Sequence, residues 1–140
     1  MTCTFFGHRD CPLDIVGALS EAIEALIVEQ HASVFLVGNQ GAFDRLVNSV
    51  LARMQDKYPD IVCYAVLAYM PNGKAVPETL LRTLLPDGIE RVPPRFAICY
   101  RNDWMLSRAD IVVTYIRRHG GGAARCAEKA ARQGKTVIEI

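Results

Sequence analysis

Three consecutive glycines, Gly120-Gly121-Gly122, stand directly before Ala123 and an alanine-rich stretch with helical character. A glycine-rich turn lets backbone N–H groups approach an anion closely, and the amino end of a helix adds a partial positive charge. Phosphate is the anion that suits such a turn. The run matches neither a Walker A loop nor a regular Gly-x-Gly-x-x-Gly, and a plain turn is the alternative. We predict that these four residues bind phosphate.

A second passage of this kind places two amides between two glycines, in Gly38-Asn39-Gln40-Gly41. Amide side chains carry the donors and acceptors that suit ribose hydroxyls or the edge of a base. Asp44 follows in the first turn of the next expected helix, where a carboxylate caps the helix and complements its dipole. The same carboxylate can instead hydrogen bond a ligand, and both roles stay open.

The end of the first apolar run, Gly7-His8-Arg9, adds a third set of polar groups. A guanidinium in this place holds a phosphate through two hydrogen bonds, unless Arg9 is a solvated surface residue. His8 either packs as a neutral residue or contacts the ligand. The three histidines lack the arrangement of a metal site, and the five cysteines include no Cys-x-x-Cys pair. We therefore expect no metal, no cofactor and no disulfide framework.

These groups must be positioned by strands and helices that alternate along the chain. Apolar runs predict strands over residues 2–6, 34–37, 61–69, 111–116 and 136–140. Apolar residues at helical spacing predict helices over residues 15–27, 41–54, 96–107 and 123–132. The proline-rich connection over residues 70–94 is expected to contain a short helix over residues 78–85.

This alternation predicts one α/β domain over residues 1–140, in which a doubly wound, Rossmann-like, mostly parallel sheet of five strands is covered by helices on both faces. The usual strand order, 3-2-1-4-5, makes the first, second and fourth strands neighbours. In this architecture ligands bind at the carboxyl ends of the strands. The loops that begin at Gly7, Gly38 and Arg117 should therefore share one crevice.

The composition sets limits on the class of protein. The 140 residues are 51% apolar and 22% charged, and 16 basic against 15 acidic residues give a net charge of +1. This balance argues against a protein whose main partner is nucleic acid or an acidic membrane surface. No apolar run approaches the roughly 18 residues of a bilayer span, and the amino end lacks the features of a secretory signal. We expect a cytoplasmic protein with Cys3, Cys63 and Cys99 in its core.

Four motifs resemble, in order, the landmarks of the SLOG superfamily: Gly7-His8-Arg9, the passage from Gly38 to Asp44, Arg101-Asn102, and Gly121-Gly122-Ala123. That superfamily includes YpsA-like proteins, Lonely Guy phosphoribohydrolases and the Rossmann domain of DprA, and this chain is most similar to small stand-alone YpsA-like members. The resemblance implies a Rossmann-like pocket for a nucleotide or nucleotide derivative, formed by the residues of these motifs. Without it, Arg101 would be explained as part of a solvated basic face with Arg95 and Arg108.

The resemblance also offers a catalytic residue. Lonely Guy enzymes carry Pro-Gly-Gly-x-Gly-Thr-x-x-Glu, and their activity requires its glutamate. Aligning the double glycine with Gly121-Gly122 places Glu128 on that glutamate and replaces the Gly-Thr pair with Ala124 and Arg125. An ordinary exposed glutamate is the alternative explanation of Glu128.

The leading hypothesis is a binding or sensing module for a small nucleotide-derived ligand. Arg9 and the glycine turn would hold phosphate, and Asn39, Gln40 and Asp44 would face the sugar or base. The first alternative is a phosphoribohydrolase in which Glu128 stabilises an oxocarbenium ion or activates water. DNA binding as in DprA is the second, and the near-neutral charge argues against it. We also expect a homo-oligomer, because a small sheet with an apolar surface helix often pairs.

Overall fold

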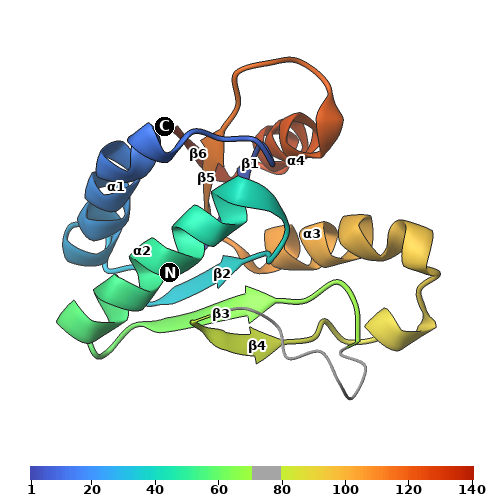
Figure 1. The fold of residues 1–140 in the computed structure, drawn as a ribbon, viewed down its shortest axis with the longest axis horizontal. Helices are drawn as coiled ribbons and strands as arrows, with labels where there is room; N and C mark the ends of the chain where they lie inside the picture. Colours follow the sequence, from blue (N-terminus) through green and yellow to red (C-terminus); the bar gives the residue numbers. More distant parts are fainter. Residues whose placement is uncertain (71–79) are drawn as a thin grey trace.

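Six strands form one parallel sheet in the computed structural model, which describes residues 1–70 and 80–140. The strands are β1 (Thr2–Gly7), β2 (Val34–Val37), β3 (Val62–Val66), β4 (Arg82–Leu84), β5 (Ile111–Tyr115) and β6 (Thr136–Glu139). They lie in the order β4-β3-β2-β1-β5-β6, and each neighbouring pair is parallel (Figure 1). β1 is thus central, between β2 and β5.

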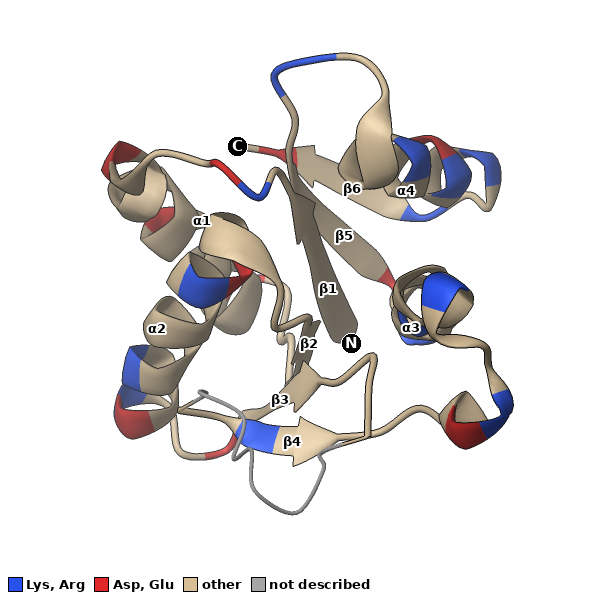
Figure 2. Cartoon of the chain, turned by 45° about the vertical axis from the view of Figure 1, so that its right-hand side comes forward, with Lys and Arg blue, Asp and Glu red and all other residues tan. Residues whose placement is uncertain are grey.

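In the described residues, four longer helices connect the strands: α1 (Val16–Val28), α2 (Gly41–Lys57), α3 (Ala97–Arg108) and α4 (Gly121–Arg132). The helices α1 and α2 cover one face of the sheet, and α3 and α4 cover the other (Figures 1 and 2). Three short 3-10 turns, at Leu13–Ile15, Ile89–Arg91 and Pro94–Phe96, lie in the connections.

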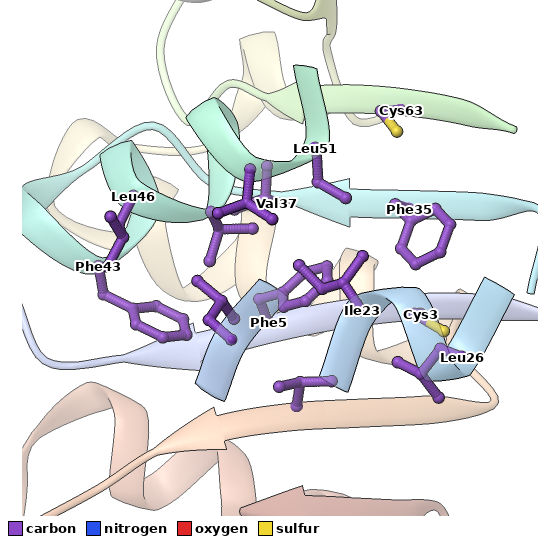
Figure 3. Close-up of a cluster of buried hydrophobic side chains, with 14 of the residues drawn as sticks. Cys3, Phe5, Ile23, Leu26, Phe35, Val37, Phe43, Leu46, Leu51 and Cys63 are labelled. Atoms are coloured by element: carbon purple, nitrogen blue, oxygen red, sulfur yellow. The ribbon is translucent and has the colours of Figure 1, made fainter. Parts of the chain in front are cut away.

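Each face of the sheet has its own apolar core, because successive side chains of a strand point to opposite faces. Phe5 of β1 belongs to the core under α1 and α2, where it lies among residues such as Ile23, Phe43 and Leu51 (Figure 3). The next residue, Phe6, belongs to the core under α3 and α4. The alternation in β1 therefore anchors both helical layers to one central strand.

The predicted α/β class, with a mostly parallel sheet and helices on both faces, is confirmed. The order of the five predicted strands is also found, in the run β3-β2-β1-β5-β6. No helix of the described residues is long and apolar enough to cross a lipid bilayer.

The sixth strand corrects the prediction of a short helix over residues 78–85. The part of that segment from residue 80 onward contains β4, which pairs with β3 from Tyr64–Arg82 to Val66–Leu84, and residues 78 and 79 lie outside the described residues. Leu81, directly before β4, is buried against the core under α1 and α2. A short apolar run is compatible with either type of element, and here pairing with the sheet edge decides it.

Candidate functional site

A cavity of about 400 Å³ lies at the carboxyl end of β1. Its walls come from β1 and the loop after it, the amino end of α2, one face of α3, and the glycine turn with the first turns of α4. The lining residues are Phe5, Phe6, Gly7, His8, Arg9, Gln40, Asp44, Ile98, Cys99, Arg101, Asn102, Met105, Arg118, Gly120, Gly121, Gly122, Ala123 and Arg125.

The three predicted loops converge because β1 lies between β2 and β5, and parallel strands end at the same edge of the sheet. Most of the predicted site residues line the cavity, namely Gly7, His8, Arg9, Gln40, Asp44, Arg101, Asn102, Gly120, Gly121, Gly122 and Ala123. The other predicted residues, Gly38, Asn39, Gly41 and Glu128, lie outside the lining.

The glycine turn leaves backbone donors available at the amino end of α4. Gly120 and Gly121 have φ values of 82°, in the left-handed region that glycine adopts without strain. No side chain caps this end of the helix. The N–H groups of the first helical turn, which lack partners within the helix, are therefore open to a ligand in the cavity.

Asp44 has a carboxylate that is nearly enclosed, with 9% of the residue exposed. Its Oδ2 accepts a hydrogen bond from the backbone N–H of Gln40, over 3.0 Å, so it satisfies a donor at the start of α2. Burial raises the pKa of Asp44 to about 6, against the lowering effects of the Gln40 N–H and of the Arg101 and Arg9 guanidinium groups. The carboxylate thus serves the helix end, as one of its two predicted roles required, and it also lines the cavity.

Arg101 is a buried cation with only 3% of the residue exposed. Its Nη1 donates to the backbone oxygen of Val66 over 3.1 Å and to Oδ1 of Asn39 over 3.3 Å, and its Nε donates to Oδ1 of Asn102 over 2.9 Å. Burial lowers its pKa, and the carboxylate of Asp44 opposes that shift. The explanation of Arg101 as part of a solvated basic face is therefore wrong.

Gly38 keeps these two charged side chains close together. A Cβ atom added at Gly38 would stand 2.6 Å from Oδ2 of Asp44 and 2.9 Å from Cζ and Nη1 of Arg101. Gly41 also has no room for a side chain, because its φ is 87° and an added Cβ would stand 2.8 Å from the Cα of Arg9. These glycines and Asn39 thus position the residues of the lining from behind it.

His8 ties the loop after β1 to the loop after β5. Its Nε2 accepts a hydrogen bond from the backbone N–H of Arg117 over 2.9 Å, and its ring stands edge-on to Tyr115. Arg118 adds a second link, with Nη2 and Nη1 at 3.0 Å and 3.3 Å from the two carboxylate oxygens of Asp10. The imidazole acts as an acceptor, which requires its neutral form.

Acidification is expected to weaken this link. Burial, helped by Arg118 and Arg117 and opposed by Asp10, lowers the pKa of His8 below its ordinary 6.5. The unfolded chain therefore takes up this proton more readily than the folded one, so the free energy of unfolding falls as pH drops below about 6.5. In urea unfolding, the wild type should lose stability relative to His8→Gln as the pH falls from 7 to 5. Parallel curves for the two proteins would contradict this role of His8.

Several residues of the lining were not singled out by the sequence analysis. Arg118 lies in the predicted loop that begins at Arg117, and Arg125 lies one turn beyond the glycines in α4. Their closeness in sequence to the glycine turn is the feature that could have predicted them as lining residues. Ile98 and Met105 are seven residues apart, about two helical turns, which places them on one face of α3. Cys99 was expected in the core, but it is exposed and lines the cavity; Cys3 and Cys63 are buried as predicted.

The described residues contain no group of three or more His, Cys, Asp or Glu side chains that could hold a metal ion. Glu128 is an exposed residue of α4. Its neighbour Lys129 pairs with Asp103 of α3 over 2.7 Å. A catalytic role of Glu128 stays a prediction.

Positive charge dominates the cavity. Its lining contains four arginines, Arg9, Arg101, Arg118 and Arg125, and one carboxylate, that of Asp44. Arg9, Arg118 and Arg125 are exposed, and Figure 2 shows basic segments in the loop between β5 and α4 and along α4. An anion would therefore be attracted to the side of the cavity formed by the loop and α4.

No protein-family model matches this chain, and no curated protein matches its sequence. Among solved structures, it is similar to DNA processing protein A (DprA) from Streptococcus pneumoniae, with a TM-score of 0.73 and 17% sequence identity. The match covers 99% of this chain and 50% of the DprA chain, so this chain spans about half the length of that protein. The likeness and the strand order together show that the chain has a Rossmann-like α/β fold.

Proposed function

We propose that this chain is a SLOG protein that binds a nucleotide or a nucleotide derivative in the cavity at the end of β1. The observation that carries the proposal is the gathering of two kinds of polar group in one cavity. An uncapped helix amino end lies beside exposed guanidinium groups, and the buried pair of Asp44 and Arg101 lines the same space.

The first kind of group suits a phosphate. The N–H groups at Gly121, Gly122 and Ala123 supply donors and a favourable dipole, and Arg9 and Arg125 supply positive charge. Arg118 uses two N–H donors on Asp10 and retains others for a ligand.

The remaining space suits the rest of a nucleotide. A volume of about 400 Å³ lies in the range of about 300–1,000 Å³ for small-molecule sites. Ile98 and Met105 give the α3 side of the cavity an apolar surface, which a base can contact.

The test is to incubate the purified protein with a pool of nucleoside phosphates and ADP-ribose derivatives. Mass spectrometry then identifies the retained and the free small molecules. We expect a ligand of this class to be retained intact. Free base with ribose phosphate, absent from a Glu128→Gln control, would instead establish the phosphoribohydrolase alternative. If no compound is retained or altered, both functions are contradicted.

Arg9→Ala is expected to weaken the binding of phosphorylated ligands by about 10- to 100-fold and to leave free nucleosides nearly unaffected. A charge-assisted hydrogen bond to phosphate has about this effect on affinity. Isothermal titration calorimetry with the retained nucleotide and its nucleoside provides the two affinities. Arg53→Ala, an exposed change farther along α2, is the control. Equal losses for nucleotide and nucleoside would contradict the assigned contact.

DNA binding is a second candidate, favoured by the likeness in fold to a DNA-processing protein. A gel-shift titration with single- and double-stranded DNA tests it. DNA binding through phosphate contacts should weaken steeply as the salt concentration rises. If the retained nucleotide displaces the DNA and abolishes the gel shift, both ligands bind in the same cavity.

A further inference from the structure

Asp44 and Arg101 each leave one polar atom without a partner among the described residues. Asp44 uses Oδ2 to accept from Gln40, and no hydrogen bond reaches its Oδ1. Arg101 uses Nε and Nη1, and its Nη2 makes no hydrogen bond. Both residues are more than nine-tenths buried, and both line the cavity.

These two atoms are not fully enclosed, and their residues line the cavity. In the described part of the chain, one side-chain nitrogen or oxygen atom is fully enclosed and has no partner, namely Nε1 of Trp104. Asp44 Oδ1 and Arg101 Nη2 also have no partner, so they are not fully enclosed. Buried polar groups in proteins nearly always have hydrogen-bond partners. A ligand that displaces water from the cavity must therefore supply partners for both atoms.

The charges of the pair favour a neutral ligand group at this point. Gly38 lets Oδ2 of the Asp44 carboxylate and Cζ and Nη1 of the Arg101 guanidinium lie near the same point, so each charge partly offsets the other. A phosphate placed here would meet a carboxylate as well as a guanidinium, whereas the glycine turn offers donors alone. The phosphate therefore belongs at the turn, and the pair is left for another part of the ligand.

A carboxylate oxygen can only accept a hydrogen bond, and a guanidinium N–H can only donate one. The group that matches both must donate to Asp44 and accept from Arg101. A hydroxyl does both, and two neighbouring hydroxyls do so in parallel. Among the parts of a nucleotide, the ribose ring carries such hydroxyls within a few bonds of the phosphate.

We infer that Asp44 Oδ1 and Arg101 Nη2 form a hydroxyl subsite, which makes the cavity selective for ribonucleotides over deoxyribonucleotides. This inference rests on the proposed function, because it assumes a phosphorylated ligand anchored at the glycine turn. A base edge also presents a donor beside an acceptor, so the test must separate sugar from base.

The test uses sugar phosphates, which contain no base. Isothermal titration calorimetry measures the affinity of the wild-type protein for ribose 5-phosphate, 2-deoxyribose 5-phosphate, 3-deoxyribose 5-phosphate and inorganic phosphate. We expect at least one deoxy sugar phosphate to bind about 10- to 100-fold more weakly than ribose 5-phosphate. The missing hydroxyl of the deoxy sugar would leave a buried charged group unpaired. Inorganic phosphate should bind more weakly than ribose 5-phosphate.

Two variants connect the preference to the subsite. Asp44→Asn keeps an oxygen for the Gln40 N–H but replaces the second acceptor with a donor, so the preference for ribose should disappear. Asp56→Asn makes the same change at an exposed position of α2 and should keep it. A preference that survives in Asp44→Asn would overturn the inference.

The outcomes for the wild type separate the two proposals. Equal affinities for the three sugar phosphates would overturn the hydroxyl subsite and leave phosphate binding in place. Discrimination among nucleotides by base alone would do the same and would assign the pair to the base. Failure of every sugar phosphate, nucleotide and inorganic phosphate to bind would overturn the proposed function and the subsite together.

Discussion

Gly7→Ala is expected to lower the free energy of unfolding by about 3 kcal/mol, at the upper end of the range for an overpacked core. An added Cβ would stand 2.3 Å from Cγ of Phe43 and 2.5 Å and 2.6 Å from the two Cδ atoms of its ring. The ring cannot move aside easily, because Phe43 is 1% exposed and stacks on Tyr115. The backbone of Gly7 is also confined, since Gly7 pairs with Tyr115 of β5.

Urea denaturation measures this loss, and Gly17→Ala is the matched control. An added Cβ at Gly17, in α1, meets nothing within 4 Å, and alanine favours a helix over glycine by about 1 kcal/mol. The two identical changes should therefore move stability in opposite directions. A Gly7→Ala protein as stable as the wild type would show that the close approach of Phe43 to β1 is not required.

The same change should also disturb the cavity, because Phe43 directly precedes Asp44 in the first turn of α2. Gly7 belongs to the first motif of the sequence, and it lines the cavity. Its packing against Phe43 explains the need for glycine there without any ligand. A motif glycine can thus be required for the approach of a helix to a strand, which sequence spacing alone does not distinguish from ligand contact.

The sequence predicts those features of the fold that depend on local periodicity. The runs that became β1, β2 and β5 are short, apolar and end in polar or glycine-rich turns, and the helices α1 and α2 show apolar spacing over several turns. The strand order then brought Gly7, Gln40 and the glycine turn to one cavity. Those predictions needed only the general rules of parallel α/β topology.

Features that depend on tertiary contacts were beyond the sequence. β4 has three residues and forms by pairing with β3, so its apolar run has no decisive period. Arg101 has the same helical spacing from Arg95 and Arg108 that a solvated face would have. It is buried because the oxygens of Val66 and Asn39, which come from other strand ends, receive its donors. No property of the α3 sequence contains that information.

The ionisation of Asp44 is expected to contribute a loss of about 3 kcal/mol in the free energy of unfolding as the pH rises from below 4 to above 6. Burial raises the pKa of Asp44 from 3.8 to about 6 in the folded chain. Between these values the folded state holds a proton that the unfolded state has released, so raising the pH favours unfolding. By about pH 7 both states are ionised, and the loss is complete.

Asp44→Asn isolates this contribution from the opposite effect of His8. The amide is neutral at every pH, so the unfolding free energy of the variant, relative to the wild type, should rise by about 3 kcal/mol between pH 4 and pH 7. Urea unfolding at four pH values measures the difference, and Asp56→Asn in the same helix controls for the substitution itself. A difference that does not change with pH would contradict the raised pKa.

The cost of ionising Asp44 should shrink when the cavity is filled. A ligand hydroxyl that donates to Oδ1 stabilises the carboxylate form, and a hydrogen bond to the charged form lowers a pKa. Repeating the wild-type series with saturating ribose 5-phosphate should therefore flatten the fall in stability between pH 4 and 6. Inorganic phosphate, which lacks the hydroxyls, should flatten it less. An equal effect of the two compounds would separate Asp44 from ligand recognition and leave its carboxylate with the single task of capping α2.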